Sequence, residues 1–225
     1  RAAELYDAFA SDYSTVILLS SQVLTILIIM VLAKLRGMPL WDLVQGGQNI
    51  GRCQVACLLM AGACGNILTT GAMELLPLPQ QLMESYNQAS QGLNTSLLWA
   101  DLLSVAIFAP LVEELIFRGF GFSQLRQFHS FWTAAGISTL AFGVYHGNVV
   151  QGLYAAVIGL FLSWVMEKKG CIIAPWLVHV SANLTSVLGG NVVKLKEWTV
   201  GVSIMLLVIL VWIIEKSSRL TDTHH

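Results

Sequence analysis

The feature that most constrains this chain is a series of apolar stretches separated by short polar connections. A helix needs about 20 apolar residues to cross the hydrocarbon core of a bilayer, which is about 30 Å thick. Seven stretches come close to this length: residues 14–33, 54–75, 97–122, 131–148, 150–166, 171–188 and 198–214. The sequence therefore predicts an all-α, polytopic membrane bundle of about seven transmembrane helices, with an eighth left open.

The composition agrees with this class of protein. Of the 225 residues, 56% are hydrophobic and 11% are charged, whereas a soluble domain usually carries about 25% charged residues. The formal net charge is −1 and there is no long run of Lys or Arg, which argues against nucleic acid as a partner. We expect one integral membrane domain over residues 1–225, surrounded by the lipid bilayer.

The basic residues of the connections are distributed unevenly between the two sides of the predicted bundle. If seven spans alternate, one side receives Lys34, Arg36, Arg52, Arg126, Lys168, Lys169, Lys216 and Arg219. The other side receives Arg1, Lys194 and Lys196. Cytoplasmic loops of membrane proteins are enriched in Lys and Arg, so this pattern predicts an outside N-terminus and a cytoplasmic C-terminus. The long polar connection at residues 76–96 would then lie outside.

Few charged or titratable side chains lie inside the predicted spans. The third span contains Glu113, Glu114 and Arg118, the fourth contains His146, and the sixth contains His179. Such groups are costly in a bilayer unless they are paired or face water, so each is a candidate for function. The alternative is a structural polar cluster that holds the helices together.

Helical spacing separates the two carboxylates of the third span. Glu114 and Arg118 are four residues apart and share one helix face, which predicts an ion pair within the helix. Glu113 is rotated by about 100° from Glu114 and has no such partner. A buried carboxylate without a partner is a candidate general acid or base.

The same spacing places His179 with Asn183, and Phe142 with His146, on single helix faces. In one scheme Glu113 and His146 activate a water, while His179 and Asn183 donate hydrogen bonds to the oxyanion of a peptide carbonyl. In another scheme Glu113, His146 and His179 hold a catalytic zinc ion with an open position for water. The spacing does not separate these schemes, although no HExxH or GxSxG motif is present.

Three motifs occur in order on successive spans: EExxxR at 113–118, FxxxH at 142–146 and HxxxN at 179–183. With the surrounding segments APLVEELIFRGF, STLAFGVYH and GCIIAPWLVHVSAN, they resemble the motifs of the CAAX protease and bacteriocin-processing family, which includes Ras-converting CAAX endopeptidases. The resemblance covers residues 97–188, which would form the protease core. Eukaryotic members usually have eight spans, which is why an eighth is left open here.

The resemblance implies an intramembrane glutamic endopeptidase that works without a metal, with zinc as the alternative cofactor. The catalytic residues would be Glu113, His146, His179 and Asn183, and the supporting residues would be Glu114, Arg118 and Phe142. The substrate would be a membrane-associated peptide precursor or a prenylated protein. The compact, loop-poor chain is typical of a bacterial member, in the cell membrane.

Two other functions use the same polar residues. One is a non-proteolytic bacteriocin-immunity or scaffold protein that binds a peptide through the same cavity. The other is a proton-coupled transporter with Glu113 and the histidines as a relay. Many transporters carry an internal repeat, and none is visible in this sequence. The complete set of motifs favours the protease.

Overall fold

The computed structural model describes residues 2–37, 50–75, 77–91, 99, 102–189 and 197–222, and the regular elements in these ranges are helices. In chain order they are α1 (Ala2–Leu35), α3 (Arg52–Leu75), α4 (Gln80–Gln91), η1 (Leu102–Phe108), α6 (Ala109–Glu114), η2 (Leu115–Phe122), α7 (Ser123–Arg126), α8 (Phe131–Tyr145), α9 (Val149–Lys169), α10 (Ile173–Gly189) and α11 (Glu197–Asp222). The predicted all-α class is confirmed.

Four helices of the described chain are long and apolar enough to cross a membrane: Val16–Leu35, Arg52–Met73, Val149–Lys169 and Thr199–Ser217. Two more apolar helices, Phe131–Tyr145 and Ile173–Leu188, are shorter. The protein is therefore an integral, polytopic helical membrane bundle. Helices cover most of the described residues in each predicted stretch, except that α8 ends at Tyr145 and α10 begins at Ile173. Four of these helices have full spanning length.

The third predicted stretch is not one regular α-helix. The π-helices η1 and η2 flank the short α-helix α6, whose last two residues are Glu113 and Glu114. Pro110 lies at the start of α6, directly after η1, and it has no N–H to donate to the carbonyls of the preceding turn. π-Helical turns are rare and occur frequently at functional sites, so this irregular backbone draws attention to the carboxylates that it positions.

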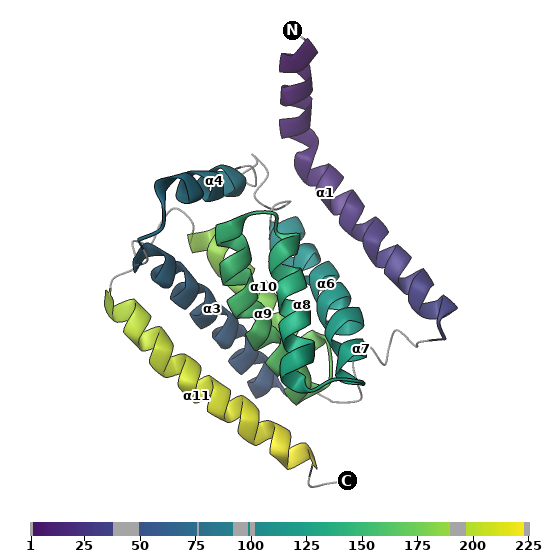
Figure 1. Cartoon of the computed structure of the whole chain (residues 1–225), viewed down its shortest axis with the longest axis vertical. Coiled ribbons are helices and arrows are strands. Elements are labelled where there is room, and N and C mark those ends of the chain that lie inside the picture. The colour runs from purple at the N-terminus through teal and green to yellow at the C-terminus, as the bar shows by residue number, and fades with distance from the viewer. Residues whose placement is uncertain are drawn as a thin grey trace.

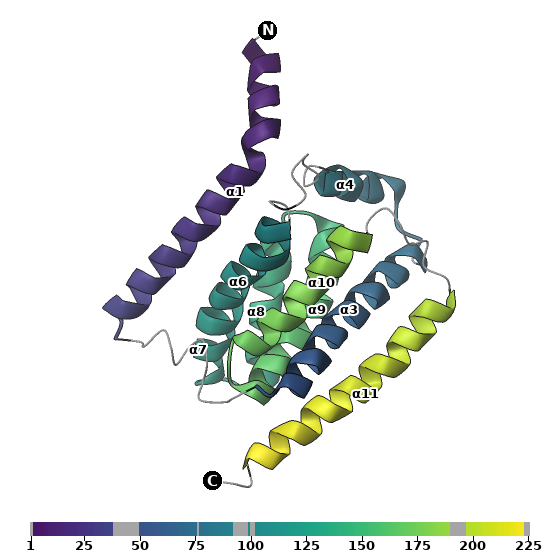
Figure 2. The same cartoon turned by 180° about the vertical axis from the view of Figure 1, so that it is seen from behind.

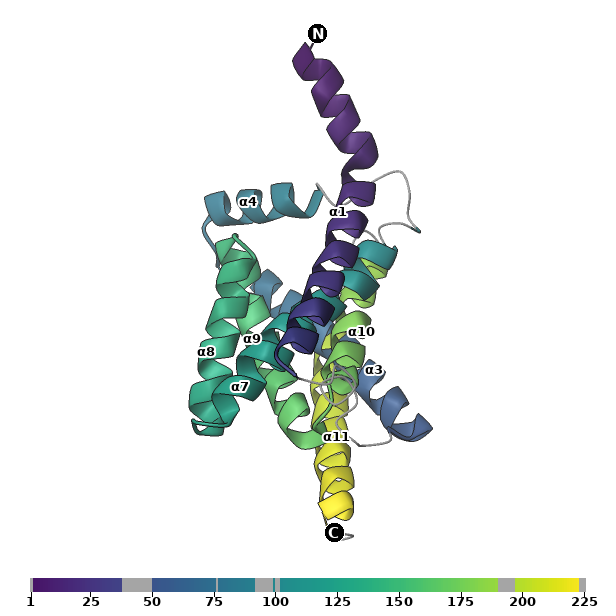
Figure 3. The same cartoon turned by 90° about the vertical axis from the view of Figure 1, so that its right-hand side faces the viewer.

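Helices α1 and α11 flank the bundle on opposite sides, and α3, α6, α8, α9 and α10 lie between them (Figures 1 and 2). Helix α4 lies across one end of the bundle (Figure 3). This twelve-residue helix forms within the polar connection at 76–96, for which the sequence predicted no helix. Asn148, which caps the N-terminus of α9, donates to the Ser85 hydroxyl of α4 at 3.0 Å, so α4 is bound to that end.

Glycines allow close approach of the helices that carry the histidines. A Cβ atom on Gly62 of α3 would fall on the backbone carbonyl of Val178 in α10. A Cβ atom on Gly152 of α9 would lie 2.7 Å from the carbonyl oxygen of Gly143 in α8. Small residues at such crossings let helix backbones pack closely within a membrane. The positions of α10 and α8 therefore depend on backbone contacts at these glycines.

Replacing Gly62 by alanine is expected to lower the free energy of unfolding by about 1–3 kcal/mol, because the added methyl group forces α3 and α10 apart. Gly65 on the same helix is the matched control, since no neighbouring atom lies within 4 Å of a Cβ atom at that position. Alanine at Gly65 is expected to be tolerated or stabilising. Unfolding of both variants in detergent measures the difference, and equal stabilities would contradict the tight crossing.

Basic residues gather at the end of the bundle opposite α4. Arg126 of α7 lies 2.9 Å from Glu167, and Lys168 of α9 lies 2.9 Å from Glu215. The C-terminal end of α1 and the N-terminal end of α3 lie at this same end (Figure 1). The cations predicted for the other side lie outside the described residues: Arg1, Lys194 and Lys196.

Candidate active site

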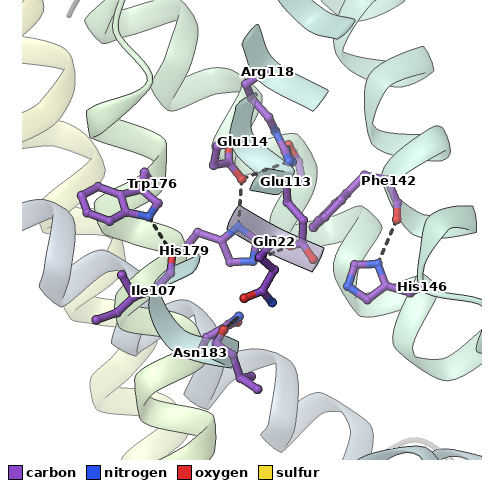
Figure 4. Close-up of polar contacts among 12 residues, drawn as sticks. Gln22, Ile107, Glu113, Glu114, Arg118, Phe142, His146, Trp176, His179 and Asn183 are labelled. Atoms are coloured by element: carbon purple, nitrogen blue, oxygen red, sulfur yellow. Dashed lines mark hydrogen bonds and ion pairs between the residues drawn. The ribbon is translucent and has the colours of Figure 1, made fainter. Parts of the chain in front are cut away.

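His179 of α10 lies between the two adjacent carboxylates of α6 (Figure 4). Its Nδ1 atom is 2.8 Å from Glu114 Oε1, and its Nε2 atom is 3.5 Å from Glu113 Oε2. Glu114 is fully buried, and the Glu113 side chain is 12% exposed. Helical spacing predicts that the side chains of Glu113 and Glu114 point about 100° apart. The His179 imidazole nevertheless contacts both carboxylates.

The predicted ion pair between Glu114 and Arg118 forms, with Arg118 Nη1 at 3.1 Å from Glu114 Oε1 and both side chains fully buried. The same carboxylate oxygen contacts His179, so Glu114 joins its own helix to α10. Arg118 Nη2 also donates to the carbonyl of Gly159 in α9 at 3.1 Å. Its guanidinium carbon lies 4.5 Å from the centre of the Phe142 ring. The ion pair therefore connects five helical segments: α6, η2, α8, α9 and α10.

Gly159 supports the contacts of Arg118 with α8 and α9, and it is not among the residues predicted from the sequence. A Cβ atom there would lie 3.0 Å from Arg118 Nη2 and 3.1 Å from Phe142 Cδ1. The missing side chain lets the guanidinium reach the Gly159 carbonyl, which also accepts from the Ser163 hydroxyl at 3.0 Å. Glycine in an apolar span is a signal of close helix approach, but its partner depends on the tertiary structure.

His146 follows the last residue of α8, and its Nδ1 atom lies 2.9 Å from the carbonyl oxygen of Phe142. A carbonyl only accepts hydrogen bonds, so Nδ1 carries the proton and Nε2 is an acceptor when the ring is neutral. The buried Phe142 ring makes edge-on contacts with both imidazoles, at 4.8 Å from His146 and 5.8 Å from His179. Both histidines lie close enough to Glu113 for a charge on either imidazole to act on its carboxylate.

Asn183 lies one helical turn beyond His179 and is bound to η1. Its Nδ2 atom donates to the carbonyl of Val105 at 2.9 Å, and Trp176 Nε1 of the same helix donates to the carbonyl of Ile107 at 3.2 Å. A primary amide has two N–H groups, so Asn183 retains one donor beyond this bond. The structure thus brings together the seven residues named from the motifs, on α6, η2, α8 and α10 and the residue that follows α8.

The residues of the zinc scheme are not arranged as a metal site. In the part of the chain that the structure describes, no three His, Cys, Asp or Glu side chains form a group suited to holding a metal ion. His179 directs its two ring nitrogens at separate carboxylates, and His146 directs Nδ1 at a backbone carbonyl.

Comparisons with known proteins agree with the motifs. Residues 95–185 match the family model described as type II CAAX prenyl endopeptidase, Rce1-like. A protein of Escherichia coli, described as an uncharacterized 24.3 kDa protein, is 32% identical over 94 residues, which cover 40% of this chain and 43% of that protein. No solved structure matches the chain significantly. Residues 95–185, which contain the three motifs, are thus similar to the type II CAAX prenyl endopeptidases of the Rce1-like family.

Proposed function

We propose that the protein is an intramembrane endopeptidase that hydrolyses a peptide bond of a membrane-associated peptide or a lipidated protein. The observation that carries the proposal is the position of His179 between Glu113 and Glu114 within an apolar bundle. Polar groups of this kind are costly inside a membrane and mark functional sites. The family of residues 95–185 supports a protease in general.

The charges of the cluster support Glu113 as the group that activates water. Arg118 compensates Glu114, whose Oε1 atom also contacts His179. With His179 protonated, both of its ring nitrogens are donors, and the two carboxylates are balanced by one guanidinium and one imidazolium. Glu113 faces His179 at the longer distance of 3.5 Å. Its carboxylate therefore retains the capacity to accept a hydrogen bond from water.

In the proposed reaction a water bound between Glu113 and Nε2 of His146 attacks the carbonyl carbon of the substrate. Glu113 accepts a proton from this water as the new C–O bond forms. The resulting oxyanion accepts hydrogen bonds from Nε2–H of His179 and from the second N–H of Asn183. The C–N bond then breaks, and Glu113 gives its proton to the leaving amine. The products are a carboxylic acid and an amine.

The experiment is cleavage of single-span and lipidated peptides by the purified protein in lipid vesicles, with the products identified by mass spectrometry. We expect cleavage that persists when divalent metals are removed with a chelator. Activity that is lost on chelation and restored by zinc would contradict the metal-free mechanism. Specific peptide binding without cleavage would favour the immunity or scaffold alternative.

We also propose that the chain lies in a bacterial cell membrane with its N-terminus outside and its C-terminus in the cytoplasm. The basic residues at one end of the bundle support this orientation, and the Escherichia coli relative supports the setting. We expect a membrane-impermeant thiol reagent to label intact cells at Gln81→Cys on α4 and not at Phe128→Cys, with the four native cysteines replaced by serine. Both positions are exposed, and the reverse labelling would overturn the orientation.

A further inference from the structure

The apolar helix α1 contributes one amide side chain to the edge of the candidate active site. Gln22 Nε2 donates to the carbonyl of Ser104 in η1, and Gln22 Oε1 accepts from the Ser104 hydroxyl, both at 3.3 Å. Three nearby hydroxyls donate instead to carbonyls of α1 itself: Ser20, Ser21 and Thr25. Figure 4 draws Gln22 together with the residues of the candidate active site. Gln22 therefore links α1 to the helix that precedes the two carboxylates.

Two amides, from α1 and α10, bind adjacent peptide units of η1. Gln22 donates to the carbonyl of Ser104, and Asn183 donates to the carbonyl of Val105. A primary amide has two N–H groups and an oxygen with two lone pairs. Gln22 uses one N–H and one lone pair on Ser104. Among the described residues, one donor and one acceptor of Gln22 have no partner, and the amide lies on the peptide unit next to the one that binds Asn183.

Helix α1 packs against the bundle along one face. Ile29 is 6% exposed and packs in one cluster with Leu115 of η2, and Ala33 is fully buried. Outward-facing residues such as Leu24 and Val31 are 58% and 56% exposed, and the start of α1 extends beyond the bundle (Figure 2). The contact between Gln22 and Ser104 is here called the α1–η1 seam.

A membrane-embedded substrate must expose its backbone before it can be cleaved. A transmembrane helix satisfies its own N–H and C=O groups, and local unwinding at the scissile bond removes these partners. Hydrocarbon supplies no replacement, so the unwound peptide units need polar groups of the enzyme. Gln22 offers both a donor and an acceptor at the α1–η1 seam. Its two 3.3 Å bonds are longer than typical N–H···O and O–H···O hydrogen bonds, which favours exchange for a substrate peptide.

We propose that Gln22 is a substrate-positioning residue, whose amide pairs with one peptide unit of an extended substrate segment that enters along the α1–η1 seam. The ligand is the unwound backbone of a membrane-embedded peptide, recognised with little dependence on its side chains. This inference rests on the proposed function. It adds a helix outside residues 95–185 to the substrate site, since α1 lies N-terminal to the family match.

The test uses a single-span peptide that the wild-type protein cleaves, and analogues in which one backbone amide near the scissile bond is replaced by an ester. Each ester removes one N–H donor. The full chain in vesicles is compared with Gln22→Met, which keeps the side-chain length without the amide, and with Ser104→Ala. Ser104→Ala removes the hydroxyl that binds Gln22 and leaves the Gln22 amide in place.

We expect the kcat/KM of the wild-type protein to fall about tenfold at one ester position, as for loss of one substrate hydrogen bond. The kcat/KM of Gln22→Met is expected to be about tenfold below that of the wild-type protein on the all-amide peptide. It is expected not to fall further on the analogue with that ester. The kcat/KM of Ser104→Ala is expected to fall at the same ester position as that of the wild-type protein. Should Gln22→Met fail to accumulate in the membrane, Gln22→Ala provides the same comparison.

A purely structural role for Gln22 predicts a different pattern. In that case Gln22→Met and Ser104→Ala would lower kcat/KM by one common factor on every analogue, and this result would overturn the inference. Unchanged ester sensitivity in Gln22→Met would overturn it as well, while cleavage by the wild-type protein would leave the proposed function standing. A wild-type protein that cleaves no membrane peptide would overturn the proposed function, and the inference with it.

Discussion

Replacing Glu113 by glutamine is expected to lower the rate of peptide cleavage by about 10²–10⁴-fold, because an amide cannot accept the proton of the attacking water. The free energy of unfolding is expected to change by less than about 1 kcal/mol, since glutamine has nearly the same shape and Glu113 is not part of the buried pair of Glu114 and Arg118. Initial cleavage rates and unfolding are measured on the same reconstituted samples.

Glu84 provides the matched control for this variant. It is an exposed residue of α4 whose carboxylate accepts from the Gln80 amide at 2.9 Å. Glu84→Gln makes the same chemical change away from the candidate active site and is expected to leave the cleavage rate unchanged. Cleavage by Glu113→Gln at more than about a tenth of the wild-type rate would contradict its role as general base. Loss of the fold in Glu113→Gln would assign it a structural role instead.

Replacing Glu114 by glutamine is expected to act mainly on stability, with a loss of about 3–5 kcal/mol in the free energy of unfolding. Arg118 is fully buried and keeps its charge, so the variant leaves a guanidinium in the bundle without its counter-ion. The contact between Glu114 and His179 also loses its charged partner. Chemical unfolding in detergent or bicelles measures the change.

The exposed ion pair of Arg126 and Glu167 is the control for this prediction. Its side chains are 40% and 29% exposed, and surface ion pairs typically contribute about 0–1 kcal/mol. Glu167→Gln is therefore expected to have a small effect on unfolding. Similar destabilisation by Glu114→Gln and Glu167→Gln would contradict the structural importance of the buried pair.

A double variant separates the structural and chemical roles of the buried pair. Glu114→Leu combined with Arg118→Met replaces both charges by apolar side chains, and such replacements are often neutral or stabilising. We expect this protein to recover much of the stability that Glu114→Gln loses. Its cleavage rate is expected to stay low, because His179 no longer has the carboxylate that orients its ring.

Some parts of the candidate site were predictable because they lie within one helix. The ion pair of Glu114 and Arg118 follows from a spacing of four residues, which places both side chains on one face. The break of the third span into π and α segments was not predicted, because its hydropathy is that of a continuous helix. Gln22 was overlooked although it left a signal. It is an amide in a span whose other polar side chains are hydroxyls of Ser and Thr, and mainly charged and titratable residues were considered as candidates for function.

The sequence by itself determined the membrane class, the helical content, the three motifs and the pairing of Glu114 with Arg118, because hydropathy and the 3.6-residue repeat act locally. Only the tertiary structure decided that both carboxylates face His179 and that Gln22 of α1 binds Ser104 of η1. These contacts join different helices, so they depend on where backbones cross. Close approach at glycines such as Gly62 sets those crossings, and linear spacing within one helix does not specify the partner helix.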